Sequence, residues 1–237
     1  MHLLAIETAT ESCSVALVCA DRLLLRAEVA PRRHAELLLP MCDEVLAEAG
    51  LARNALDAIA VGRGPGAFTG VRLGVAAAQG MALALDVPIV PVSSLAALAM
   101  HAPDDEATIL ATIDARMGEV YAGVFRRTDD GRVEPVADER VCAAGALELP
   151  AATGWRVVGT GWASYRETLA ARLTAPLRSA EGDRFPRADH VALLALPIAR
   201  AGQGMAPEHV APVYLRDKVA LTMAEQEAAR SGASPAR

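Results

Sequence analysis

The sequence has few aromatic side chains and no excess of positive charge. Phe, Trp and Tyr make up 3% of its 237 residues, and 23 Lys and Arg residues are outnumbered by 29 Asp and Glu residues, which gives a net charge of -6. Proteins that bind nucleic acid alone usually have a basic surface, and unpaired bases stack on aromatic rings. We therefore expect any contact with RNA to be shared with a partner.

Cysteine is also scarce. The four cysteines, Cys13, Cys19, Cys42 and Cys142, form no Cys-x-x-Cys motif, so we expect small buried thiols in a reducing compartment. No basic segment precedes the first apolar run, which argues against a signal peptide. The longest apolar stretch, 71–85, is too short and interrupted to cross a bilayer. These features predict a cytoplasmic protein without a membrane anchor.

The signatures of several enzyme classes are missing. No two of the five histidines are four residues apart, and no nucleophile motif is present. The glycine-rich turn Gly62–Gly66 is not followed by the Lys-Ser or Lys-Thr of a P-loop, and Pro65 removes a backbone donor that a dinucleotide site would need. A metal site assembled from distant residues and a modest anion site at the start of the next helix stay open.

The chain does contain a long, nearly uncharged stretch, Val61–Leu85. Its glycine turn leads into a helix expected over about 71–85, with Thr69 as the expected N-cap. Only Arg72 and Gln79 are strongly polar in this helix, whereas an ordinary surface helix has a polar face. We therefore expect the helix to be covered on one side by its own core and on the other by a partner protein.

The apolar periodicity predicts an α/β protein. In the first half we expect strands at 3–6, 14–18, 23–29, 58–61 and 88–92, and helices at 34–49, 71–85 and about 94–101. In the second half we expect two strands within 109–125, another at 156–158, and helices near 163–173 and 190–201. The first three strands follow one another through short connections, which indicates an antiparallel start to the first sheet.

The opening pattern returns in the second half. Ile6-Glu7 and Ile113-Asp114 each end an apolar strand and lie 107 residues apart. A two-fold repeat at this scale predicts two similar lobes, each a mixed sheet flanked by helices. We place the lobes at 1–103 and 104–222 and expect a disordered tail over 223–237.

Two lobes that each open with a strand, an acid and a tight turn match the actin-like ATPase plan, also called ASKHA or ribonuclease-H-like. In that plan the two turns hold nucleotide phosphates and a metal across a cleft. The candidate nucleotide-binding residues are Glu7, Thr8, Thr10, Gly159 and Gly161. The first turn lacks the glycine that would let phosphate approach its backbone. A structural turn is therefore favoured, while weak or vestigial nucleotide binding and nucleotide turnover stay open.

With these residues laid out, the chain resembles the bacterial TsaB family, also called YeaZ, up to about Val219. The motifs that carry the resemblance are Leu4–Glu11, Leu38–Met41, Gly62–Gly74, Ile113–Tyr121, Gly159–Trp162 and Pro212–Arg216. Two departures are small: Glu7 stands where the family often has Asp, and Ala67 where it often has Ser.

The resemblance implies a role in making N6-threonylcarbamoyladenosine (t6A) beside the anticodon of tRNA. It implies a non-catalytic partner protein, with a TsaD-like subunit that transfers the threonylcarbamoyl group from threonylcarbamoyl-AMP and a small TsaE-like ATPase. It also implies no catalytic residue, no metal and no tightly bound cofactor in this chain. ATP or ADP is an option only at the level of the complex, and tRNA contact occurs only through the complex.

The resemblance further implies that a heterodimer forms through the first-lobe helices, here 34–49 and 71–85. The predicted interface residues are Leu38, Met41, Val45, Arg72, Val75, Ala78, Gln79 and Ala82. Gly74, Ala78 and Ala82 recur every four residues, so a neighbouring helix could approach closely along that row, and an exposed apolar face of this kind usually marks an interface. Without its partner the same face is expected to pair with itself, which predicts a homodimer.

Two other functions remain alternatives at this stage. An actin-like ATPase or kinase acting alone would bind ATP with Mg²⁺ and would depend on Glu7 or Asp114. A peptidase would need a metal or a nucleophile that the sequence does not display.

Overall fold

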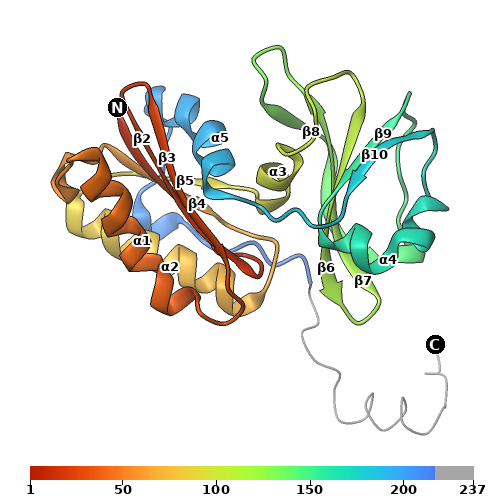
Figure 1. Cartoon of the computed structure of the whole chain (residues 1–237), viewed down its shortest axis with the longest axis horizontal. Helices are drawn as coiled ribbons and strands as arrows, with labels where there is room; N and C mark the ends of the chain where they lie inside the picture. Colours follow the sequence, from red (N-terminus) through yellow and green to blue (C-terminus); the bar gives the residue numbers. More distant parts are fainter. Residues whose placement is uncertain (217–237) are drawn as a thin grey trace, which may run out of the picture.

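The computed structural model describes residues 1–216, which form two five-stranded sheets side by side (Figure 1). The first sheet has the strand order β3-β2-β1-β4-β5, and the second has the order β10-β9-β6-β7-β8. Each sheet combines three antiparallel strands with two parallel ones. The expected fold class, two mixed sheets flanked by helices, is confirmed.

The strands are β1 (His2–Glu7), β2 (Ser12–Cys19), β3 (Arg22–Val29), β4 (Ala58–Gly62), β5 (Ile89–Val92), β6 (Thr108–Arg116), β7 (Glu119–Arg127), β8 (Val133–Ala143), β9 (Trp155–Val158) and β10 (Leu177–Glu181). The α-helices are α1 (His34–Ala49), α2 (Phe68–Leu85), α3 (Ser94–Ala99), α4 (Thr160–Ala170) and α5 (Ala188–Arg200). Short 3-10 turns are η1 (Arg53–Ala55), η2 (Ala144–Ala146) and η3 (Pro207–His209).

The sequence repeat corresponds to a repeat in strand pairing. In the first sheet Ile6 of β1 lies opposite Val15 on its antiparallel neighbour and opposite Val61 on its parallel neighbour. In the second sheet Ile113 of β6 lies opposite Tyr121 of β7, and β6 is also parallel to β9. β1 and β6 are thus the equivalent central strands of the two sheets, as the offset predicts.

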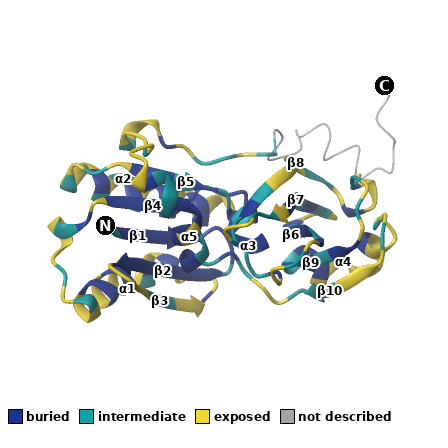
Figure 2. Ribbon diagram, turned by 90° about the horizontal axis from the view of Figure 1, so that it is seen from above, coloured by how far each residue is buried: buried dark blue, intermediate teal, exposed yellow. Residues whose placement is uncertain are grey.

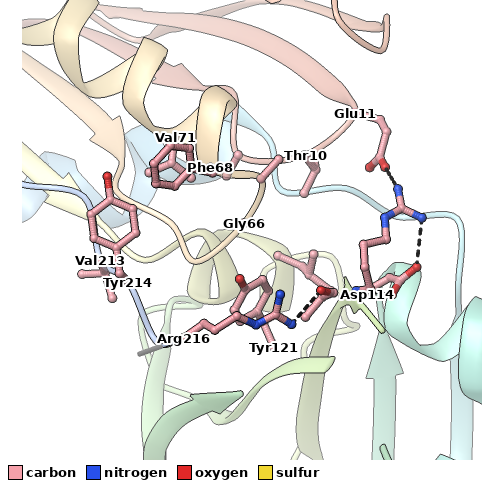
Figure 3. Close-up of a pocket in the computed structure, with 15 residues that line it drawn as sticks. Thr10, Glu11, Gly66, Phe68, Val71, Asp114, Tyr121, Val213, Tyr214 and Arg216 are labelled. Carbon is pink, nitrogen blue, oxygen red and sulfur yellow. Dashed lines mark hydrogen bonds and ion pairs between the residues drawn. The ribbon is translucent and has the colours of Figure 1, made fainter. Parts of the chain in front are cut away.

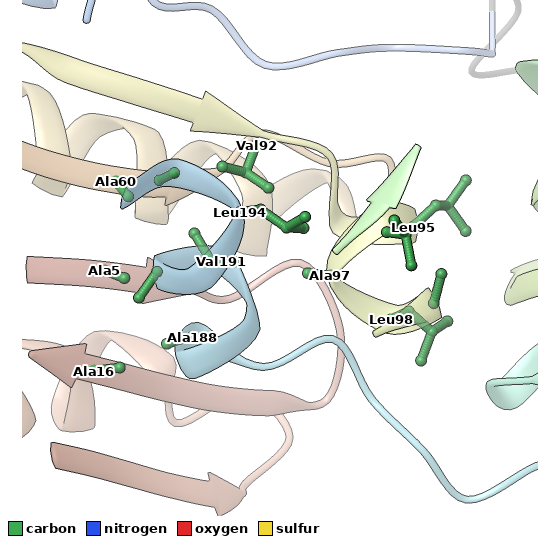
Figure 4. Close-up of a cluster of buried hydrophobic side chains, with 14 of the residues drawn as sticks. Ala5, Ala16, Ala60, Val92, Leu95, Ala97, Leu98, Ala188, Val191 and Leu194 are labelled. Atoms are coloured by element: carbon green, nitrogen blue, oxygen red, sulfur yellow. The ribbon is translucent and has the colours of Figure 1, made fainter. Parts of the chain in front are cut away.

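Two helices do not follow the predicted lobe limits of 1–103 and 104–222. α3, from the first half of the chain, packs against β6, β7 and β8 of the second sheet, and α5, from the second half, packs against β1, β2 and β4 of the first. Figure 4 shows Val191 and Leu194 of α5 beside Ala5 and Ala60, with α3 next to them. The physical reason is that both helices are apolar on the faces that meet, so one buried cluster joins the two sheets. Residues 217–222 and the expected tail 223–237 lie outside the described residues.

A second core lies between the first sheet and the pair α1 and α2, on the face opposite α5 (Figure 1). β1, β2 and β4 are buried along nearly their whole lengths, whereas β8 and β10 carry exposed residues (Figure 2). α1 spans its predicted residues with Pro40 inside it, and it ends at Gly50, whose φ of 68° is the left-handed conformation that glycine adopts without strain. Among the described residues, α2 alone is long and apolar enough by composition to span a membrane.

α2 begins one residue before Thr69, so the expected N-cap is wrong. The cap position is Ala67, which has no capping side chain. Its N–H donates instead to the carbonyl oxygen of Ala9 at 2.7 Å. The start of the helix is therefore fixed by docking on the turn after β1 rather than by a side-chain cap.

Candidate functional site

The glycine-rich turn before α2 folds tightly over the turn that follows β1. A β-carbon added to Gly66 would lie 2.2 Å from the carbonyl oxygen of Ala9, and one added to Gly70 would lie 2.2 Å from the carbonyl oxygen of Thr8. Any side chain at these positions would overlap backbone atoms. The glycines are needed because two backbone segments touch here.

Glu7, the acid at the end of β1, is completely buried. Its Oε1 accepts from the N–H of Ala9 at 2.7 Å, and its Oε2 accepts from the hydroxyl of Ser94 at 2.7 Å. A β-carbon on Gly62 would lie 2.0 Å from Oε2, so the carboxyl is pressed against β4. Burial raises its pKa, and the hydrogen bonds from Ser94 and Ala9 oppose that rise. A carboxyl held in this way is not exposed to a metal ion or a nucleotide.

The two threonines of the same turn also bond within the chain. The hydroxyl of Thr8 donates to the carbonyl oxygen of Gly70 at 2.8 Å. The carbonyl oxygen of Thr10 is 2.8 Å from Nε2 of His34, at the start of α1. Both threonines are buried, although Thr10 lines the cavity between the lobes. The turn is thus held by α1 and α2 together.

Gly159 and Gly161, the candidates in the second lobe, lie where α4 begins against β6. Gly159 has a φ of 103°, and an added β-carbon there would lie 2.2 Å from the carbonyl oxygen of Thr112. One added to Gly161 would lie 2.7 Å from the Thr112 β-carbon. These glycines allow α4 to approach the strand closely, and neither of them lines the cavity between the lobes.

A cavity of about 250 Å³ lies between the two lobes (Figure 3). Asp114 and Arg116 border it from the second lobe, and Glu11 borders it from the first. Nη1 of Arg116 is 3.2 Å from Asp114, and its Nη2 donates to Glu11 at 2.9 Å, so one guanidinium links both lobes. Asp114 also accepts from the hydroxyls of Ser164 and Tyr165. Its oxygens are therefore occupied by donors of this chain.

Residues 203–216 run along the first lobe and reach the second, a connection that the sequence analysis did not anticipate. Met205 forms an antiparallel bridge with Ile89 of β5. The N–H of Val213 donates to the carbonyl oxygen of Arg63 at 2.8 Å, and Arg216 binds Glu119 and the carbonyl oxygen of Ala115 in the second lobe. The sequence shows the Pro212–Arg216 motif, but its periodicity does not indicate which part of the chain this segment contacts.

The structure corrects most of the predicted interface residues. Six of the eight are buried within the first-lobe core: Leu38, Met41, Val45, Val75, Ala78 and Ala82. Gly74, in the same row, faces Thr8 and Val61 of its own lobe. The small or apolar residues of α1 and α2 that are exposed to solvent include instead Leu39, Ala76, Gly80, Leu83 and Ala84. The apolar periodicity correctly predicts the helix. However, most of the residues assigned to the partner interface lie on the side of the helix that faces the core of its own lobe.

Arg72 and Gln79, the other two predicted interface residues, contact the C-terminal segment of their own chain. Nε2 of Gln79 donates to the carbonyl oxygens of Pro207 and Val210 at 2.9 and 3.0 Å. Nε of Arg72 donates to the hydroxyl of Tyr214 at 2.6 Å. Arg72 is exposed, whereas Gln79 is half-buried.

An apolar groove of about 330 Å³ opens between α1 and α2. Leu39, Gly80 and Met81 contribute to its walls. Asp43 and Arg53 form an ion pair at 2.5 Å among the lining residues. The first lobe therefore has a shallow apolar face of its own, separate from the cavity between the lobes. Within residues 1–216, no group of three or more His, Cys, Asp or Glu side chains is arranged to hold a metal ion.

Comparison with known proteins agrees with this architecture. The family model TsaD, described as tRNA N6-adenosine threonylcarbamoyltransferase, matches residues 26–223. The chain is 38% identical over 227 residues to the tRNA threonylcarbamoyladenosine biosynthesis protein TsaB of Escherichia coli strain K12, covering 93% of this chain and 96% of that protein. The chain belongs to the TsaB family. The Haemophilus influenzae TsaB is 39% identical, over 92% of this chain and 95% of its own length.

A solved TsaB-family structure has the same fold. YeaZ from Pseudomonas aeruginosa superimposes with a TM-score of 0.82 at 42% sequence identity, covering 90% of this chain and 99% of that one. Coverage this complete places both sheets within the shared TsaB fold.

Proposed function

We propose that the chain is a non-catalytic partner protein in the biosynthesis of t6A in tRNA. The relatives named TsaB are described as threonylcarbamoyladenosine biosynthesis proteins, and they match along nearly their whole lengths. In this proposal a TsaD-like subunit transfers the threonylcarbamoyl group, a TsaE-like ATPase assists, and tRNA contacts this chain only as part of the complex.

One observation carries the non-catalytic part of the proposal. The turn residues that would hold a nucleotide in an actin-like ATPase are engaged within the chain. Glu7 bonds to Ser94 and Ala9, and Thr8 bonds to Gly70. A phosphate or hydrated metal would have to displace α2 to reach them. Binding to a partner therefore accounts for the chain better than chemistry of its own.

We place the partner on the outer face of α1 and α2. Leu39 and Leu83 are 55% and 63% exposed, and the apolar groove opens beside Leu39. Apolar residues held toward solvent on neighbouring helices are typical of an interface. Without its partner the chain would use the same face to form a homodimer.

The test is association with the TsaD-like subunit, measured with Leu83→Glu and Leu39→Glu. Both side chains are exposed, so the variants should fold, and a carboxylate in the contact should weaken binding at least tenfold. Val75 is unsuitable because it is only 3% exposed and a carboxylate there would unfold the first lobe. The matched control is Leu177→Glu, which alters a 42% exposed leucine on β10 of the second sheet.

Wild-type binding by the control together with loss in both α1 and α2 variants would support the proposed face. Wild-type binding by all three variants, with folding confirmed by thermal melting, would refute it. The same variants, sized without the partner at micromolar concentration, test the homodimer. A clean wild-type monomer would contradict that part of the proposal.

A further inference from the structure

The first turns of α2 display an exposed arginine packed against two neighbouring aromatic rings. The Arg72 guanidinium carbon is 3.6 Å from the ring centroid of Phe68, one turn earlier, and 5.4 Å from that of Tyr214. The two ring centroids are 5.8 Å apart. All three side chains are exposed, Phe68 by 47% and Tyr214 by 48%. We call these three residues the arginine clamp.

The guanidinium is fixed in place but not neutralised. Its Nε bonds to the Tyr214 hydroxyl, while its Nη1 and Nη2 groups have no hydrogen-bond partner within residues 1–216. Two other surface arginines of the first lobe are paired with carboxylates. Arg26 binds Glu44 and Glu48, and Arg53 binds Asp43. Within residues 1–216 the Arg72 guanidinium therefore keeps paired donors that fit a carboxylate.

The surroundings favour an anion at this point. The first turn of α2 has no capping side chain and no acidic residue, so the positive end of the helix dipole is not offset there. An arginine already immobilised by stacking loses little conformational entropy when it binds, and Arg and aromatic residues dominate the binding energy of many interfaces.

The clamp is continuous with the proposed partner face. Ala76 lies four residues after Arg72, and Leu83 lies seven residues after Ala76, so the three residues lie along one side of the helix. All three are exposed. A protein that covers Leu83 and the groove would reach the clamp by extending along α2 toward its first turn.

We propose that the arginine clamp binds an Asp or Glu side chain of the TsaD-like partner and thereby sets how that partner is positioned along α2. This inference rests on the proposed function. The carboxylate accepts two hydrogen bonds from the terminal nitrogens of Arg72, while Tyr214 keeps its hydrogen bond with Nε. The clamp thus adds a polar, orienting contact to an otherwise apolar face.

The experiment measures association of the full chain with the TsaD-like subunit for Arg72→Gln, Arg72→Lys and Leu83→Glu, at low and high salt. Arg72→Gln should weaken association tenfold or more and should reduce its salt dependence, because a charge pair is lost. Arg72→Lys keeps the charge but loses the planar fork, so it should recover only part of the affinity. Tyr214→Phe keeps the ring and should weaken binding by only a few-fold.

The outcomes separate this inference from the proposed function. Loss of binding by Leu83→Glu with unchanged binding by Arg72→Gln would overturn the clamp and leave the proposed face intact. Unchanged binding by both variants would overturn both. Loss in Tyr214→Phe as large as in Arg72→Gln would mean that Arg72 acts by anchoring the C-terminal segment, which would also overturn carboxylate binding.

Discussion

Arg116 of the second lobe donates to Glu11 of the first at 2.9 Å, across the cavity between the lobes. The same guanidinium is 3.2 Å from Asp114, and the Arg116 N–H also donates to Asp114 at 2.8 Å. Asp114 thus shapes the turn from which Arg116 reaches the opposite lobe.

We expect these two acids to differ in their effect on stability. Arg116 is 72% exposed, so Glu11→Gln should change the free energy of unfolding by less than about 1 kcal/mol. Asp114→Ala removes an acceptor that serves one backbone and three side-chain donors, and should cost about 1.5–3 kcal/mol. Denaturant unfolding checks both values, and equal effects would mean that Asp114 does not organise the turn.

Glycines within α2 provide a matched pair for the docking of this helix on the turn after β1. Gly70→Ala would place a β-carbon 2.2 Å from a backbone oxygen and should destabilise the chain by about 1–3 kcal/mol. Gly80→Ala meets nothing within 4 Å and should stabilise the helix by about 0.5–1 kcal/mol. Thermal melts of both variants measure the contrast, and a Gly70→Ala protein as stable as Gly80→Ala would contradict the close contact.

The buried carboxyl of Glu7 should make the stability of the fold depend on pH. Burial raises its pKa above the ordinary value of 4.5, so below pH 4.5 it is protonated in both the folded and unfolded chains. As the pH rises from there through the folded-state pKa, the unfolded chain ionises first and stability is lost. Glu7→Gln has no such loss, since its amide can accept from Ala9 and donate to Ser94. The stability of Glu7→Gln relative to the wild type should therefore increase between pH 4.5 and 8. A difference in stability that stays constant over this range would contradict the raised pKa of Glu7.

The buried ring of His190 should have the opposite effect, a loss of stability as the pH falls. Burial, together with the nearby charges of His101 and Arg187, lowers its pKa from 6.5 to about 4, although Asp189 opposes this shift. Its ring packs on His101 with centroids 4.4 Å apart, where α5 meets the end of α3. Because the unfolded chain takes up this proton first, stability should fall as the pH drops from 6.5 toward 4.

His190→Asn, which can still bond the carbonyl oxygen of Ala97, is the comparison for that acid-dependent loss. Its stability should fall less steeply than that of the wild type over the same pH range. Parallel curves from guanidinium titrations at each pH would show that another group is responsible.

Much of the architecture could be predicted from the sequence because it depends on local patterns. The apolar strands, α1 with its terminal Gly50, and the repeat that equates Ile6 with Ile113 all appear as periodicity or spacing. The exchange of α3 and α5 between the sheets could not be predicted, since an apolar helix face does not specify which sheet it covers.

The site was harder to predict for a related reason. The row of Gly74, Ala78 and Ala82 indicates close packing. The same pattern allows packing against a strand of the same chain or against a helix of another chain. Glu7 is a candidate because of its position at the end of β1. Only the geometry reveals that Gly62 lies against its carboxyl and that Ser94, 87 residues away, donates to it.

The most direct test of the account is t6A formation on tRNA, reconstituted with the purified TsaD-like and TsaE-like proteins. We predict that Glu7→Gln supports nearly wild-type t6A formation and that Leu83→Glu, although folded, supports at least tenfold less because it fails to bind its partner. If a folded Glu7→Gln protein that still binds its partner yields no t6A, or if Leu83→Glu is fully active, the account of a non-catalytic partner acting through the α1 and α2 face is contradicted.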